Sequence, residues 1–130
     1  MAMLGIGMAM SWRDFERCVD AAFRRQGYKV TGFGRNSTGF GRSGPDGGAD
    51  LGLIKNGQRF LVHCRHWRKR RVGVAEVREL KGIMSAHGAH GGFVVTGGEF
   101  TLEARGLADA CKIKLVDGAA LEALIAHPKP

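Results

Sequence analysis

The stretch of sequence from Gly44 to Arg65, GPDGGADLGLIKNGQRFLVHCR, decides how this chain folds. Two apolar runs, residues 50–55 and 58–65, flank an Asn-Gly pair, which is the strongest short signal for a two-residue β-hairpin turn. The glycine-rich segment before the first run delivers Asp50 to the start of the first strand. The sequence therefore predicts an antiparallel hairpin with an acidic residue at its open end.

Polar residues close the second strand of this hairpin, which ends in His63 and Arg65. Because successive side chains of a strand point to opposite faces of a sheet, these two residues share one face, while Val62 and Cys64 share the other. Asp50 begins the strand that pairs with this one, so its carboxylate can face the polar pair. The hairpin thus has a geometry that can build a site from Asp50, His63 and Arg65.

The composition favours a small basic protein with a polyanionic partner. The chain has 130 residues, which suits one domain with one core. A net charge of +8 favours nucleic acid as the partner before an anionic membrane surface. Three widely spaced cysteines indicate reduced core residues of a cytoplasmic protein, not a disulfide framework or a zinc site. Residues 1–10 are apolar but too short to span a bilayer, so we expect no integral membrane segment and a flexible extension there.

Hydrophobic periodicity predicts the other elements. Apolar residues at helical spacing follow Ser11, a good N-cap, and Gly27 is a typical helix end. The expected elements are helices over residues 11–26, 73–87, 101–110 and 119–126, and strands over residues 28–33, 50–55, 58–65, 92–96 and 113–116. We therefore expect one domain over residues 11–126, followed by a tail over residues 127–130.

Four blocks of sequence carry a resemblance to a known family. They are GPDGGADL at residues 44–51, FLVHCRHW at 60–67, VGV and VREL between 72 and 80, and GGFVVT at 91–96. In content and order they resemble the Mrr-type restriction endonuclease domain, which belongs to the PD-(D/E)xK nuclease superfamily. The resemblance runs from about residue 11 to residue 125. It implies an α/β fold with an αβββαβ core, in which helices flank a mixed central sheet.

The resemblance also implies a set of catalytic residues. In the superfamily, an acid from the first hairpin strand and a carboxylate or glutamine two residues before a lysine hold a divalent cation. Asp50 matches the acid, whereas Asp46 lies four residues earlier in the loop and is the weaker match. His63 stands where glutamine or glutamate is usual, and Arg65 where lysine is usual. A glutamate of the first helix often leans toward the metal, which assigns that role to Glu16. The alternative for Glu16 is a solvated helix carboxylate.

The two departures from the family pattern change the chemistry of the implied site. The histidine nitrogen of His63 suits Mn²⁺ or Zn²⁺ better than Mg²⁺, and an imidazole with a pKa near ~6.5 can itself act as a base. Arg65 stays protonated and cannot be a base, but its fork of donors can clamp a phosphate. The resemblance implies Asp50 and His63 as metal ligands, with Mg²⁺ as the cofactor and Mn²⁺ as the alternative.

Basic residues gather on both sides of the hairpin. The loop over residues 34–48 contains Gly-Phe-Gly-Arg twice, so Arg35 and Arg42 are accompanied by backbone amides that can approach phosphate closely. A second cluster combines aromatic and basic side chains suited to stacking and phosphate neutralisation. This cluster consists of His66, Trp67, Arg68, Lys69, Arg70 and Arg71. We expect both segments to contact DNA, and the alternative for each is a solvated surface.

Three hypotheses for the function follow. The first is a metal-dependent DNA endonuclease of the Mrr restriction type, with low intrinsic sequence specificity because no separate recognition domain is evident. The second is a nuclease-fold protein that binds DNA without efficient cleavage. The third is a basic interaction domain in which His63 and Arg65 are structural. Double-strand cleavage needs two sites, which points to a homodimer in the first case.

Overall fold

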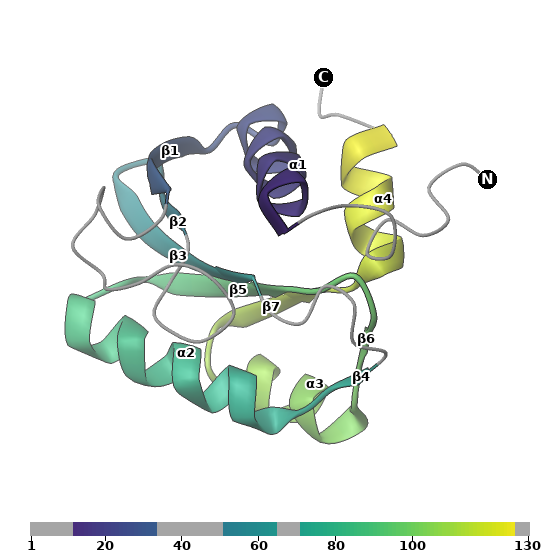
Figure 1. Cartoon of the computed structure of the whole chain (residues 1–130). Helices are drawn as coiled ribbons and strands as arrows, with labels where there is room; N and C mark the ends of the chain where they lie inside the picture. Colours follow the sequence, from purple (N-terminus) through teal and green to yellow (C-terminus); the bar gives the residue numbers. More distant parts are fainter. Residues whose placement is uncertain (1–11, 34–50, 65–70, 127–130) are drawn as a thin grey trace.

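A mixed β-sheet lies between two layers of helices in the computed structural model, which describes residues 12–33, 51–64 and 71–126 (Figure 1). The helices are α1 (Trp12–Arg25), α2 (Val74–His87), α3 (Leu102–Ala110) and α4 (Gly118–Ala126). The strands are β1 (Lys29–Phe33), β2 (Leu51–Lys55), β3 (Gln58–Cys64), β4 (Arg71–Val72), β5 (Gly91–Val95), β6 (Glu99–Phe100) and β7 (Ile113–Val116). None of the described helices is long and apolar enough to cross a membrane.

The five-stranded sheet has the order β1-β2-β3-β5-β7. β1, β2 and β3 pair antiparallel, whereas β5 pairs parallel with both β3 and β7. Parallel neighbours need a crossover connection, and α2 and α3 supply it between β3 and β5 and between β5 and β7. The predicted αβββαβ core with a mixed central sheet is confirmed.

The hairpin between β2 and β3 has the turn that its sequence predicts. Asn56 and Gly57 both adopt positive φ angles, of 55° and 78°, as a type I′ turn requires. The turn sets the register, in which Lys55 lies opposite Gln58 and Leu51 lies opposite Val62. The local chemistry of two residues therefore fixes which side chains meet along the whole hairpin.

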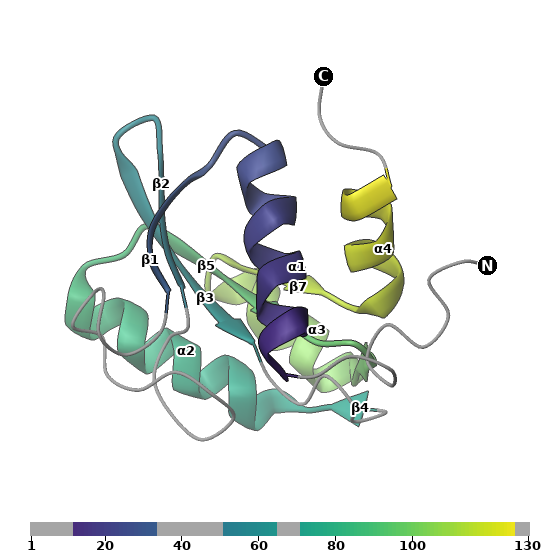
Figure 2. The same ribbon diagram turned by 45° about the horizontal axis from the view of Figure 1, so that its top comes forward.

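Two hydrophobic cores fill the spaces between the sheet and the helices. α1 and α4 cover one face, and α2 and α3 cover the other (Figures 1 and 2). β3 contributes to both cores, because Val62 and Cys64 pack toward α1 and α4 while Leu61 packs toward α2 and α3. This alternation confirms that Val62 and Cys64 share one face, and it directs His63 to the side of α2, whereas Arg65 lies outside the described residues.

Helix ends follow the expected capping chemistry. Thr101 begins α3, and its Oγ1 accepts a hydrogen bond of 3.1 Å from the Ala104 amide. Asp117 begins α4 in the same way, with Oδ1 accepting from the Ala120 amide at 2.8 Å. Gly27 follows α1 with a φ of +94°, a conformation that glycine adopts without strain. The four helices lie within a residue or two of their predicted bounds.

The sequence did not predict the two-stranded sheet formed by β4 and β6. These strands pair parallel, with Arg71 opposite Glu99 and Val72 opposite Phe100. Val72 and Phe100 are buried in the core under α2 and α3. Each strand has two residues, which is too short for a hydrophobic period to be visible. Arg71 therefore belongs to a small sheet, although its side chain is exposed.

Candidate functional site

The candidate site lies where the parallel strands of the sheet end. The carboxyl ends of β3, β5 and β7 share one edge, and polar residues lie at or just after each of them: His63, Thr96 and Asp117. In open sheets with parallel strands, ligands bind at this edge. The position of His63 near the end of β3 therefore agrees with a functional role.

His63 is fully buried, with an exposed fraction of 0%. It lies beside Val94 of β5 and faces α2, because β3 alternates between the two cores. A buried imidazole is costly unless polar groups compensate for the loss of water. The fold therefore places at this position a group that needs a polar environment.

Glu79 of α2 supplies a polar contact to His63. Its Oε1 atom lies 3.8 Å from His63 Nε2, within ion-pair range but beyond a direct hydrogen bond. The Glu79 side chain is 43% exposed, so the carboxylate nearest to the buried imidazole is itself partly in solvent. The sequence analysis did not single out this residue. Glu79 lies three residues after Glu76 and four before Ile83, a spacing that puts the three residues on one side of the helix. In the structure Glu76 and Ile83 are both half-buried.

Glu16 of α1 is buried, with an exposed fraction of 7%. This burial contradicts the alternative of a solvated helix carboxylate. The side chain belongs to the helix layer that covers the opposite face of the sheet from α2. Glu16 and His63 therefore belong to opposite sides of the sheet, and the proposed role of Glu16 near a metal stays a prediction.

The described donors fit a divalent cation only in part. Within the described residues, the Glu16 Oε2 and His63 Nδ1 atoms are buried without a hydrogen bond, although both residues have other interactions. Across residues 12–33, 51–64 and 71–126, no three His, Cys, Asp or Glu side chains form a group that could hold a metal ion. The His63 imidazole nitrogen suits Mn²⁺ or Zn²⁺ better than Mg²⁺, and ligands beyond the described residues would be needed to complete a site.

Most of the predicted site lies outside the described residues. This applies to Asp46, Asp50, Arg65, Arg35, Arg42, His66, Trp67, Arg68, Lys69 and Arg70. Arg71 is described, and it is the exposed first residue of β4. The structure thus places His63, Glu16 and Arg71 among the predicted residues and adds Glu79.

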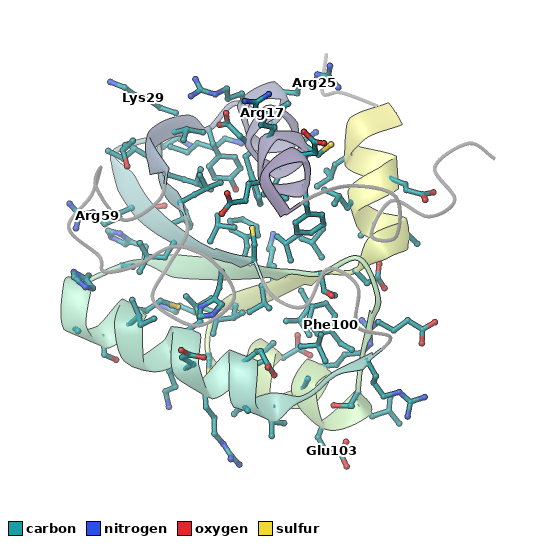
Figure 3. All side chains as sticks on the ribbon, in the orientation of Figure 1. Arg17, Arg25, Lys29, Arg59, Phe100 and Glu103 are labelled. Atoms are coloured by element: carbon teal, nitrogen blue, oxygen red, sulfur yellow. The ribbon has the colours of Figure 1, made fainter. Side chains whose placement is uncertain are left out.

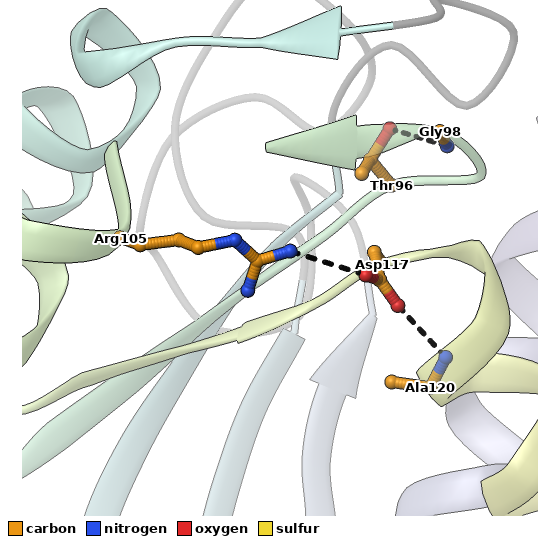
Figure 4. A network of polar contacts seen from close by, with 5 residues as sticks. All are labelled: Thr96, Gly98, Arg105, Asp117 and Ala120. Carbon is orange, nitrogen blue, oxygen red and sulfur yellow. Dashed lines mark hydrogen bonds and ion pairs between the residues drawn. The ribbon is translucent and has the colours of Figure 1, made fainter. Parts of the chain in front are cut away.

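A polar network supports the same edge of the sheet. Asp117 caps α4 and also accepts from Arg105 of α3, with 3.3 Å between Nη2 and Oδ2 (Figure 4). Thr96 is buried directly after β5, and its Oγ1 accepts from the Gly98 amide at 3.2 Å. These contacts tie α3 and α4 to the strand ends, so their role is structural.

Part of the positive charge lies at the other end of the hairpin. Figure 3 shows Lys29 and Arg59, which both pair with Ile54 close to the turn. Arg59 donates to the His87 carbonyl at 3.4 Å, and Lys55 donates to the Gln26 carbonyl at 3.0 Å. Arg59 and Lys55 thereby bind the hairpin to α2 and to the end of α1. The net charge therefore does not by itself locate a DNA-binding surface.

Comparison with known proteins gives a family and a fold. A family model described as restriction endonuclease, Mrr_cat, matches residues 8–125. Among solved structures, a protein of unknown function, AF1548, has a TM-score of 0.65 and 17% identity, and the match covers 83% of this chain and 61% of that one. No protein with a curated description matches the sequence.

Two further solved structures share the fold. The DNA modification-dependent restriction endonuclease AspBHI has a TM-score of 0.60 and 20% identity, with 86% of this chain and 30% of that one covered. A complex of EndoMS with double-stranded DNA has a TM-score of 0.55 and 16% identity, with coverages of 85% and 46%. The chain thus spans less than two thirds of each of these three proteins. At these identities the likeness establishes the fold.

Proposed function

Because this chain belongs to the Mrr_cat family of restriction endonuclease domains, we propose that it is a metal-dependent DNA endonuclease of the Mrr restriction type. The family supports a DNA nuclease, and PD-(D/E)xK restriction endonucleases generally depend on a divalent metal. We further propose low intrinsic sequence specificity and a cytoplasmic location. DNA as the partner is supported by the EndoMS neighbour, whose structure is a DNA complex.

The observation that carries this proposal is the position of His63. It lies near the end of β3, buried and facing α2, at the position where the family usually has glutamine or glutamate. In the hairpin register Leu51 lies opposite Val62, so one further step of the ladder would bring Asp50 opposite His63. Residues directly opposite in an antiparallel pair share one face. We propose that Asp50 and His63 form the core of the site.

Each proposed residue has a chemical role. A divalent cation, when bound, would offset the negative charge that develops on phosphorus and lower the pKa of a bound water. Asp50 and His63 would hold it, which favours Mn²⁺ over Mg²⁺ because of the imidazole nitrogen. Arg65 would clamp the phosphate through its fork of donors, since it cannot remove a proton from water. The catalytic role of Glu16 stays a prediction, because its helix covers the face of the sheet opposite the one that His63 faces.

We propose a DNA surface that adjoins this site. Arg35 and Arg42 of the glycine-rich loop, together with the basic run over residues 66–71, would neutralise phosphates along the backbone. Arg71 is the described member of this run, and it is exposed at the first position of β4, three residues before α2 begins. Cleavage of both strands would require two copies of the site, so we propose a homodimer on DNA.

Plasmid cleavage tests the proposal. Wild type, Asp50→Ala and the double variant His63→Gln with Arg65→Lys are compared in Mg²⁺ and then in Mn²⁺. We expect the wild type to cut, preferably with Mn²⁺, and Asp50→Ala to lose cutting. Asp109→Ala, at an exposed position of α3, is the matched control and should cut like wild type. Persistent cutting by Asp50→Ala would refute the assigned site.

A second candidate function is DNA binding without efficient cleavage. The observation that favours it is the pair of departures at residues 63 and 65, because neither side chain is the usual one. In that case only the double variant His63→Gln with Arg65→Lys, which restores the family pattern, would cut. Wild type would still bind DNA, with an affinity that falls steeply as salt increases. Absence of both cutting and binding would support a basic interaction domain instead.

A further inference from the structure

We propose that the end of the sheet at the hairpin turn is a second DNA-contacting surface, which binds the phosphates of duplex DNA without reading its sequence. The inference rests on the DNA partner proposed above. It adds a surface at the opposite end of the parallel strands from the candidate site. This surface, which we call the basic edge, is formed by four described segments, residues 24–30, 54–60, 87–92 and 110–113.

The distribution of charge is the first argument. The four segments contain six Lys or Arg residues and no Asp or Glu, so all twelve carboxylate side chains of the chain lie elsewhere in the sequence. The six are Arg24, Arg25, Lys29, Lys55, Arg59 and Lys112. Arg24 pairs with Asp20 at 2.9 Å. Lys29 and Lys112 are exposed, and neither forms an ion pair with a carboxylate of the described residues. A surface of one sign attracts a polyanion.

The cations lie in a line across the strands, which is the second argument. Lys29 pairs with Ile54, which pairs with Arg59, so the three share one row of the sheet (Figure 3). The His90 amide donates to the Arg59 carbonyl at 2.8 Å, which extends the row toward β5, and Lys112 directly precedes β7. Four strand spacings of about 4.8 Å give the edge a width of about 19 Å. That width matches about five or six phosphates of one DNA strand, at about 3.4 Å of helix axis each.

Contacts with uncharged groups hold part of the edge in place. Lys55 Nζ donates to the Gln26 carbonyl at 3.0 Å and lies 4.7 Å from the centroid of the Tyr28 ring. Neither group has a formal charge, so these contacts orient the ammonium group without neutralising it. A side chain that is already ordered loses less entropy when it binds a ligand. The edge therefore presents a positive charge that is positioned before DNA arrives.

The spacing along β3 relates the edge to the candidate site. Arg59 and His63 are four residues apart on this strand, which corresponds to about 13 Å. DNA that occupied the candidate site and also reached the edge would contact it about four base pairs from the cut. The edge would thus lengthen the footprint on DNA and would strengthen binding without adding to the chemistry.

The experiment measures affinity for a duplex of about 30 base pairs by fluorescence anisotropy, at salt concentrations from about 0.05 to 0.3 M. The test variant combines Lys29→Gln with Lys112→Gln. We expect it to bind about 10–100-fold more weakly at about 0.1 M salt, and the slope of log affinity against log salt to become shallower by about two, because each phosphate contact contributes about 0.9. The charge-preserving pair Lys29→Arg with Lys112→Arg should bind like wild type.

A matched control removes the same charge from another surface. Arg78→Gln with Lys81→Gln changes two exposed positions of α2, and we expect its affinity and salt slope to stay close to those of wild type. Equal weakening in the test and control pairs would mean that only net charge matters and would overturn the inference. Wild-type affinity in the test pair would also overturn it and leave the proposed function intact, even if binding to phosphatidylserine vesicles fell and so assigned the edge to a membrane. Absence of DNA binding by wild type would overturn the proposed function and the inference together.

Discussion

The backbone at the start of α4 predicts that Gly118→Ala destabilises the protein. A Cβ atom on Gly118 would lie 2.5 Å from the Gly97 carbonyl oxygen and 3.1 Å from its carbon. The obstacle is backbone, so it cannot be relieved by rotating a side chain. The Gly118 amide also donates to the Gly98 carbonyl at 2.9 Å, and a shift that makes room for the methyl group would weaken this hydrogen bond. The region is the one drawn in Figure 4.

The size of the effect follows from three contributions. Overpacking at a close contact costs about 1–3 kcal/mol, and loss of a hydrogen bond costs about 0.5–1.5 kcal/mol. Alanine reduces the entropy of the unfolded chain, which offsets about 0.4–1 kcal/mol. We therefore expect the free energy of unfolding to fall by about 0.5–4 kcal/mol. For a chain of this size, that corresponds to a Tm lower by about 2–16 °C.

Thermal and urea unfolding check this prediction against a matched control. Gly106 lies within α3, and a Cβ added there meets nothing within 4 Å. Gly106→Ala should therefore raise the free energy of unfolding by about 0.5–1 kcal/mol, since alanine is the better helix former. The two identical substitutions are expected to have opposite signs. A Gly118→Ala protein as stable as wild type would refute the steric argument.

Two further predictions concern α4 and a thiol. Asp117→Ala should lower the free energy of unfolding by about 0.5–2 kcal/mol, because the Ala120 amide loses its cap, whereas Arg105→Ala should cost less than about 1 kcal/mol since the ion pair is exposed. Equal losses in urea unfolding would contradict the cap as the main contribution. Burial, with a smaller effect of the Asp14 charge, raises the pKa of the Cys18 thiol. The contribution of Cys18 to the free energy of unfolding is therefore full below the ordinary thiol pKa. It is lost as the pH rises through the raised pKa of the folded protein. At about pH 8, iodoacetamide should alkylate Cys18 more slowly than free cysteine, and a rate equal to that of free cysteine would contradict this.

The sequence by itself determined the local elements and their order. The turn at Asn56 and Gly57, the helix starts near Thr101 and Asp117, and the apolar periods of the helices were all visible, and the structure has them. The alternation along β3 was equally visible, so the division of its side chains between two faces was predicted correctly. These features depend on residues close together in the chain, which is why the sequence is enough to predict them.

Tertiary structure alone decided which distant residues meet. The pairing of Arg71 with Glu99 joins two strands too short to show a period, and the helices that follow these strands, α2 and α3, contact each other. The burial of Glu16 and the contact of Glu79 with His63 likewise depend on how each helix lies on the sheet. A helical period shows which face is apolar, but the polar residues beside that face become buried or stay exposed according to the packing of the layer against them.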